Sequence, residues 1–133
     1  MKISFSPPDM TELEVQGAAE AIRSGWITTG PKTKEFERRI AAYCHTKKAV
    51  CLNSQTACEE MALRLLGIGA ENGGSASDEV IVPAYTYTAS ASVVCHVGAK
   101  LVLIDSQKDA LEMDYDALEA AVNDNTKAVI PVD

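Results

Sequence analysis

Apolar residues follow two different patterns along this chain. In residues 12–24 and 34–43 they recur at helical spacing between charged residues, which predicts two amphipathic helices. The other pattern is a short, nearly unbroken apolar run, typical of strands that are buried on both faces. Four such runs occur, at residues 48–52, 79–82, 100–105 and 127–132. The chain therefore combines two early helices with a set of buried strands.

Strands and helices alternate from residue 48 onward, because a helical pattern follows each of the first three strands. This order predicts the α/β class, with a three-layer fold in which a parallel sheet carries helices on both faces. We expect residues 1–47 to form a helical lead-in and residues 48–133 to form a βαβαβαβ unit. Thr11 and Glu14 predict a capping box at the start of the first helix.

Composition excludes several classes of function. The 133 residues carry a formal net charge of −7, which argues against a nucleic-acid partner, since phosphate backbones are bound by clustered Lys and Arg. No apolar run approaches the length of a membrane span, and the first residues do not resemble a signal peptide. We therefore expect a cytoplasmic protein with no membrane contact. The four cysteines form no CxxC pair, so we expect no metal site.

The turn at residues 52–57 is the strongest local feature. An apolar run stops at Asn53, and a helix pattern begins at once. The first turn of a helix has unpaired backbone N–H groups and the positive end of the helix dipole, which together suit a phosphate. Asn53 or Ser54 could equally be a simple N-cap. The turn contains no glycine, which argues against a dinucleotide-binding motif.

Other polar or aromatic clusters also follow predicted strands. Residues 85–87 (Tyr-Thr-Tyr) follow the second strand, and Asp105 ends the third. Ligands of open parallel sheets bind beyond the carboxyl ends of the strands, so we expect these clusters to converge with the turn after Asn53. Residues 25–31 form a loop that is bounded by glycines and holds the only tryptophan, Trp26. Its alternative role is a connection in which Trp26 covers the edge of a core.

These motifs together resemble the DegT/DnrJ/EryC1/StrS aminotransferases. The resemblance runs through nearly the whole chain, and its most specific parts are the Gly-Trp-Ile-Thr-Thr-Gly-Pro loop at residues 25–31 and the Ser-x-Thr-Ala turn at residues 54–57. Further matches lie at residues 5–8, 78–83 and 126–132. The family implies the large domain of a pyridoxal-phosphate (PLP) enzyme of fold type I. It also implies PLP as cofactor.

The resemblance assigns roles to particular residues. It places the PLP phosphate on the turn at Thr56 and Ala57, where the backbone N–H groups and the Thr56 hydroxyl are donors, and Gln55 is a further candidate contact of the cofactor. Gln55 stands where relatives more often have a small residue, and it could crowd this turn. Tyr87 matches the aromatic residue that stacks on the pyridine ring. The loop residues implied to lie near the substrate and the dimer interface are Trp26, Thr28, Thr29 and Gly30.

The activity implied by the resemblance is transfer of an amino group from an amino acid, usually glutamate, to a keto nucleotide-sugar in cell-surface polysaccharide or amino-sugar biosynthesis. Members of the family are homodimers. The lysine that forms the Schiff base and the aspartate that pairs with the pyridinium nitrogen match no residue here, so these residues supply no catalytic group. We expect the second half of the large domain and a C-terminal small domain to lie outside this sequence.

Two alternatives stay open at this stage. Because residue 133 directly follows a predicted strand, the chain could instead be a truncated, non-catalytic remnant, or a regulatory or assembly protein. It could also belong to a sugar dehydratase of the same family, because the distinguishing lysine position is not in view. Residues 70–77, which are rich in Gly and Ser, form a longer loop than is usual in the family, and we expect this loop to be exposed and mobile.

Overall fold

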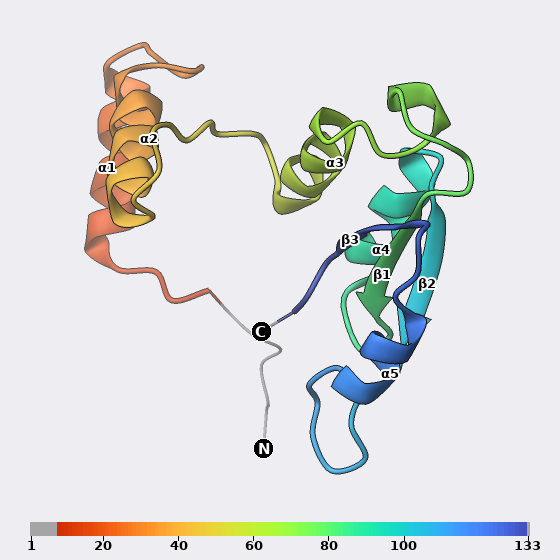
Figure 1. Ribbon diagram of the computed structural model, residues 1–133. Helices are drawn as coiled ribbons and strands as arrows, with labels where there is room; N and C mark the ends of the chain where they lie inside the picture. Colours follow the sequence, from red (N-terminus) through yellow and green to blue (C-terminus); the bar gives the residue numbers. More distant parts are fainter. Residues whose placement is uncertain (1–7, 133) are drawn as a thin grey trace. The chain divides into compact units, whose positions relative to one another are not determined.

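The structure, a computed structural model, describes residues 8–132 (Figure 1). The match to the family at residues 5–8 therefore lies, apart from Pro8, outside the described residues, as does Asp133. The chain forms two compact units, Met1–Cys51 and Leu52–Asp133. The first contains two helices and the second contains the sheet.

The first unit consists of α1 (Glu12–Arg23) and α2 (Pro31–Tyr43). Thr11 caps α1 as predicted: its hydroxyl accepts from the N–H of Leu13 at 3.2 Å, and its own N–H donates to Oε2 of Glu14 at 2.6 Å. Gly25 follows the helix with φ of 73°, a left-handed conformation that glycine adopts without strain. Pro31 starts α2 three residues earlier than the apolar pattern predicts, because proline suits the first position of a helix.

Apolar side chains of α1 and α2 remain largely exposed within this unit. Among its described residues only Gly30 and Ala41 are buried, whereas Leu13, Ile22 and Phe36 are each more than half exposed. The helices thus have the amphipathic faces that the sequence predicts, but packing inside the unit does not cover them.

The second unit is built on a parallel sheet of three described strands (Figure 1). These are β1 (Glu79–Pro83), β2 (Lys100–Ile104) and β3 (Thr126–Val129), in the order β2-β1-β3. Val80 of β1 lies opposite Leu101 of β2 and Ala128 of β3. The α/β class and the parallel arrangement are therefore as predicted.

Helices cover both faces of this sheet. Val80 and Val82 point to one face and pack with residues of α3 (Gln55–Leu65) and α4 (Thr88–His96), including Leu63 and Val93. Ile81 points to the opposite face and packs with Met113 and with residues of α5 (Tyr115–Ala121). This alternation along β1 follows from the two-residue period of a strand. The result is the three-layer arrangement that the sequence predicts.

The strand predicted at residues 48–52 is not formed. These residues have no regular secondary structure, and the boundary between the two units falls among them. The N–H of Cys51 donates instead to Oε1 of Glu37 at 2.9 Å. An apolar run indicates burial, but a strand also needs a neighbour that offers a hydrogen-bonding ladder. The described sheet accordingly has three strands rather than the predicted four.

The loop at residues 70–77 is exposed at most positions, as predicted, and contains the short 3-10 helix η1 (Ala70–Asn72). Asp78 holds it, because its Oδ2 accepts from the N–H of Gly69 at 3.0 Å and from the N–H of Ser75 at 2.9 Å. The bonds from Ser75 and Gly69 hold the pKa of the Asp78 carboxyl below its usual value. The mobility of the loop at residues 70–77 stays a prediction.

Candidate cofactor site

The start of α3 has the geometry of an anion site. Ser54 is the N-cap, and its Oγ accepts from the N–H of Ala57 at 3.1 Å. The backbone N–H groups of Gln55 and Thr56 donate no hydrogen bond within the described part of the chain, nor does the Thr56 hydroxyl. These three donors belong to the first turn, where the helix dipole is positive. The turn thus combines the simple N-cap with free donors that could hold a phosphate.

Gln55 does not fold back over this turn. Its Nε2 donates to Oε1 of Glu59, one turn further along α3, at 3.3 Å, and the residue is exposed. The side chain therefore runs along the helix surface. The Gln55 side chain therefore does not crowd the turn at residues 54–57, as its size had suggested it could.

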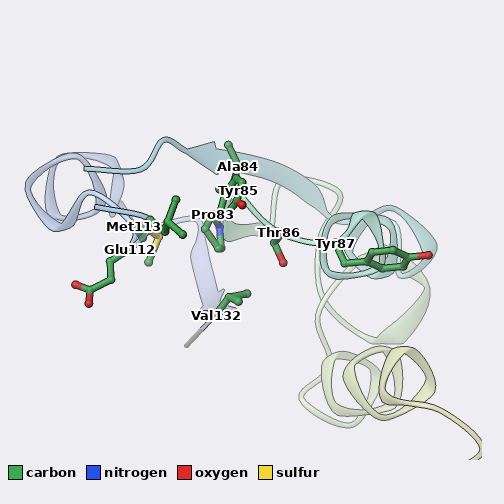
Figure 2. A pocket seen from close by; sticks show the side chains of 9 residues that line it. Pro83, Ala84, Tyr85, Thr86, Tyr87, Glu112, Met113 and Val132 are labelled. Atoms are coloured by element: carbon green, nitrogen blue, oxygen red, sulfur yellow. The ribbon is translucent and has the colours of Figure 1, made fainter. Parts of the chain in front are cut away.

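Tyr87 is the N-cap residue of α4 and follows the carboxyl end of β1 by four positions. Its side chain is 84% exposed, so its ring is free to stack on a flat partner. Tyr85, Thr86 and Tyr87 line a cavity of about 670 Å³, here called the strand-end cavity. Figure 2 shows its lining, with the ring of Tyr87 directed away from Glu112 and Met113.

The loop after β2 supplies cavity residues that the sequence did not single out: Leu111, Glu112 and Met113. The N–H of Gln107 donates to the carbonyl of Glu112 at 2.9 Å, which folds the loop back on itself. Ligands of parallel sheets bind beyond the carboxyl ends of the strands, which is why the sequence pointed to residues 85–87. The same argument applies to the end of β2 and would have predicted this loop. Asp105, expected at this edge, instead accepts from the N–H of Ser106 at 2.8 Å and does not line the cavity.

The Trp26 loop has a local structure of its own in the first unit. The Trp26 Nε1 donates to the carbonyl of Thr29 at 2.9 Å, so the indole folds over the loop. A Cβ atom on Gly30 would lie 2.1 Å from Cδ1 of this indole, so glycine is required for the contact. Trp26, Thr28 and Gly30 also line a cavity of about 460 Å³.

The predicted site residues therefore fall into two groups. Gln55, Thr56, Ala57 and Tyr87 belong to the unit that contains the sheet, and the Trp26 loop belongs to the other unit. Residues 8–132 contain no group of three or more His, Cys, Asp or Glu residues placed to hold a metal ion. None of the helices described is both long and apolar enough to span a bilayer.

Comparison with known proteins identifies the family. The sequence model of the DegT/DnrJ/EryC1/StrS aminotransferase family matches residues 8–133. The chain belongs to this family. The Gly-Trp-Ile-Thr-Thr-Gly-Pro loop and the turn at residues 54–57 both lie within the matched range, so the resemblance carried by these motifs is confirmed.

Individual relatives agree with this membership. The spore coat polysaccharide biosynthesis protein SpsC of Bacillus subtilis is 39% identical over 130 residues, which are 98% of this chain and 32% of SpsC. Spr1654 of Streptococcus pneumoniae, whose name assigns it to the sugar aminotransferases, is 56% identical in its PLP form with a TM-score of 0.85, over 98% of this chain and 32% of Spr1654.

A third relative is DesV of S. venezuelae, which was solved with a ketimine intermediate. It is 38% identical with a TM-score of 0.76, over 90% of this chain and 31% of DesV. This chain thus spans about a third of the length of these relatives, and over that length its fold is that of PLP-dependent aminotransferases. The predicted fold type is confirmed.

Proposed function

We propose that this chain forms the N-terminal part of the large domain of a sugar aminotransferase and holds the phosphate of PLP at the start of α3. The observation that carries the proposal is the set of donors there: the N–H groups of Gln55 and Thr56 and the Thr56 hydroxyl, none bonded within residues 8–132. A phosphate can accept from all three, and the helix dipole favours its charge.

The residues present fit this cofactor. The turn at residues 54–57, here called the phosphate turn, begins α3. This helix has 11 residues, so its dipole places a partial positive charge at the turn. Tyr87 offers an exposed aromatic face to the ring. When bound, PLP supplies the electron sink for amino-group transfer. The task of these residues is to anchor the phosphate and to orient the ring, since the chain contributes no group that we assign to proton transfer.

The proposed substrates are a keto nucleotide-sugar and an amino-acid donor, for which we propose glutamate, the donor that the family most often uses. Support comes from the relatives: SpsC is named for polysaccharide biosynthesis, and Spr1654 has been solved in PLP and PMP forms. We further propose a cytoplasmic homodimer in which Trp26, Thr28, Thr29 and Gly30 lie near the substrate. The Schiff-base lysine would come from the remainder of a family-length protein.

The phosphate assignment is tested by calorimetric titration of the chain with pyridoxine 5′-phosphate, which has the ring and the phosphate but no aldehyde to react with surface lysines. Thr56→Val removes one donor and keeps the shape, so we expect weaker binding by roughly 1–2 kcal/mol, as for a hydrogen bond to a charged group. Thr56→Ser keeps the hydroxyl and should bind normally. Equal affinities of the valine and unaltered chains would count against the assignment.

The reaction is tested in a family-length protein that contains this chain. Incubation with glutamate and a keto nucleotide-sugar should yield an amino sugar and 2-oxoglutarate in equal amounts. Release of water from the sugar without amino transfer would instead identify the dehydratase. Absence of both reactions across a panel of keto nucleotide-sugars would favour the non-catalytic alternative.

A further inference from the structure

A polar cluster joins the C-terminal halves of α3 and α4. Glu60 of α3 uses its two carboxylate oxygens separately: Oε1 lies 2.9 Å from Nη2 of Arg64, and Oε2 lies 3.0 Å from Nδ1 of His96 in α4. Arg64 also donates from Nη1 to Asn72 of η1 at 2.9 Å. Asn72 in turn donates to the carbonyls of Ile68 and Val97, at 2.9 and 3.1 Å. One carboxylate therefore ties α3 directly to α4.

The opposite ends of the same two helices carry the proposed cofactor contacts. α4 leaves the carboxyl end of β1, and α3 leads through η1 into the amino end of β1, so both helices run antiparallel to the strand. Figure 1 shows α3 beside α4 in this unit, and Leu63 and Val93 share one core cluster. The phosphate turn is at the start of α3, and Tyr87 immediately precedes α4. A shift of α3 relative to α4 would therefore move the phosphate turn relative to Tyr87.

We propose that Glu60 is a positioning residue, which through His96 sets α3 against α4 so that the phosphate turn and Tyr87 engage the same cofactor molecule. The proposal rests on the proposed function, because it assumes that both contacts serve one ligand. Glu60 itself is on the helix body, more than a full turn from Thr56, and would not touch the cofactor.

The apolar contacts between the helices make this role separable from folding. Leu63, Val93 and Val94 are each at most 3% exposed, so the core remains when the polar cluster is changed. The Glu60 and His96 side chains are partly exposed, at 29% and 51%. The other group on this carboxylate is Arg64 of α3, whose Nη2 also donates to the backbone carbonyl of His96 at 3.4 Å, a longer contact than the 3.0 Å bond between Glu60 and His96. His96 is therefore the contact through which the carboxylate acts between the helices.

The test uses three probes in calorimetric titrations of the chain: pyridoxine 5′-phosphate, inorganic phosphate and pyridoxine. In Glu60→Gln we expect the affinity for pyridoxine 5′-phosphate to fall roughly two- to thirtyfold, the range found for residues that couple two sites. The affinity for inorganic phosphate should be unchanged, because phosphate touches only the α3 turn. His96→Ala should behave like Glu60→Gln, and His96→Gln, which retains a donor toward Glu60, should recover most of the affinity.

Glu35→Gln is the matched control, because Glu35 also binds two basic side chains, Arg38 and Arg39, but lies on α2 in the other unit. It should leave all three affinities unchanged. Equal losses for phosphate and pyridoxine 5′-phosphate in Glu60→Gln would indicate general disruption of the unit and overturn the positioning role alone. Failure of the unaltered chain to bind pyridoxine 5′-phosphate or phosphate would overturn the proposed function and, with it, this inference.

Discussion

The hydroxyl of Ser54 accepts a hydrogen bond from the backbone N–H of Ala57 at 3.1 Å. The sequence offered two interpretations of this turn, a helix cap and a phosphate site. The structure forms the cap, and the cap takes the N–H of Ala57, which the sequence had also assigned to the phosphate. The Ser54 hydroxyl accepts from the N–H of Ala57, while the N–H groups of Gln55 and Thr56 form no hydrogen bond in the described part of the chain. A phosphate that also took the N–H of Ala57 would have to replace the Ser54 hydroxyl.

This competition predicts the effect of Ser54→Ala. Loss of an N-cap hydroxyl usually costs about 1 kcal/mol of stability, and we expect that loss in urea unfolding of the chain without ligand. Added phosphate should recover part of it, because the anion can accept from the N–H of Ala57 in place of the hydroxyl. Thr46→Val is a suitable control: the Thr46 hydroxyl donates to the carbonyl of Lys48 within the other unit, so phosphate should not recover the stability lost with that bond. Recovery of equal size in both variants would contradict the shared-donor interpretation.

The packing of Gly30 against Trp26 predicts a local spectroscopic change. In Gly30→Ala the new methyl group would overlap the indole, which must move and lose its hydrogen bond to Thr29. Because Trp26 is the only tryptophan, its fluorescence should shift in wavelength and become more accessible to iodide quenching.

Gly17→Ala is the matched control for that variant. Beyond its chain neighbours and the nearby backbone of its own helix, no described heavy atom lies within 4 Å of the position a Cβ would take on Gly17, in the middle of α1. The change should leave Trp26 fluorescence unaltered and stabilise the helix by roughly 0.5–1 kcal/mol. An unchanged spectrum in Gly30→Ala would show that the indole contact is not maintained in solution.

The exposure of Tyr87 predicts that its ring contributes to ligand affinity and not to folding. Tyr87→Ala should leave urea unfolding nearly unchanged, because the side chain is 84% exposed. Binding of pyridoxine 5′-phosphate should weaken by about 0.5–1.5 kcal/mol, the usual contribution of an aromatic pair, while Tyr87→Phe should retain it. A large loss of stability in Tyr87→Ala, or an equal loss of affinity in Tyr87→Phe, would assign the residue a different role.

Glu79 predicts part of the acid sensitivity of the chain. Hydrogen bonds from Lys100, at 2.7 Å, and from Asn123, at 2.8 Å, hold the pKa of the Glu79 carboxyl below its usual value of 4.5. A lowered folded-state pKa contributes stability above the unfolded-state value and loses it as the pH falls through the folded-state value. The free energy of unfolding in urea should therefore decrease as the pH falls below about 4.5. This decrease should be less steep in Glu79→Gln.

Glu119→Gln provides the comparison for this pH dependence. Glu119 is an exposed carboxylate of α5 that makes no side-chain hydrogen bond or ion pair in the part of the chain described. Its replacement should leave the acid slope of unfolding unchanged. If Glu79→Gln and the unaltered chain lose the same stability as the pH falls, the Glu79 carboxylate does not govern the acid sensitivity.

Local sequence chemistry determined much of this fold. Thr11 and Glu14 specify the start of α1, and Asp114 caps α5 through the N–H groups of Asp116 and Ala117, because short polar side chains reach the free donors of a helix start. The apolar runs at β1, β2 and β3 mark strands, and their alternation with helices predicts the parallel sheet. Of these strands only β1 is buried at every position, whereas β2 and β3 each have exposed positions. The specific loop at residues 25–31 and the turn at residues 54–57 were enough to identify the family.

Tertiary structure decided what depends on distant partners. Residues 48–52 are as apolar as a strand, yet no neighbouring strand pairs with them in the described sheet. The apolar pattern likewise could not place Glu112 and Met113 beside Tyr85, nor join Glu60 to His96 across 36 positions of sequence. A local pattern reports the preference of a segment for helix, strand or burial. Which segments then meet depends on packing and hydrogen bonding between parts of the chain that are far apart in sequence.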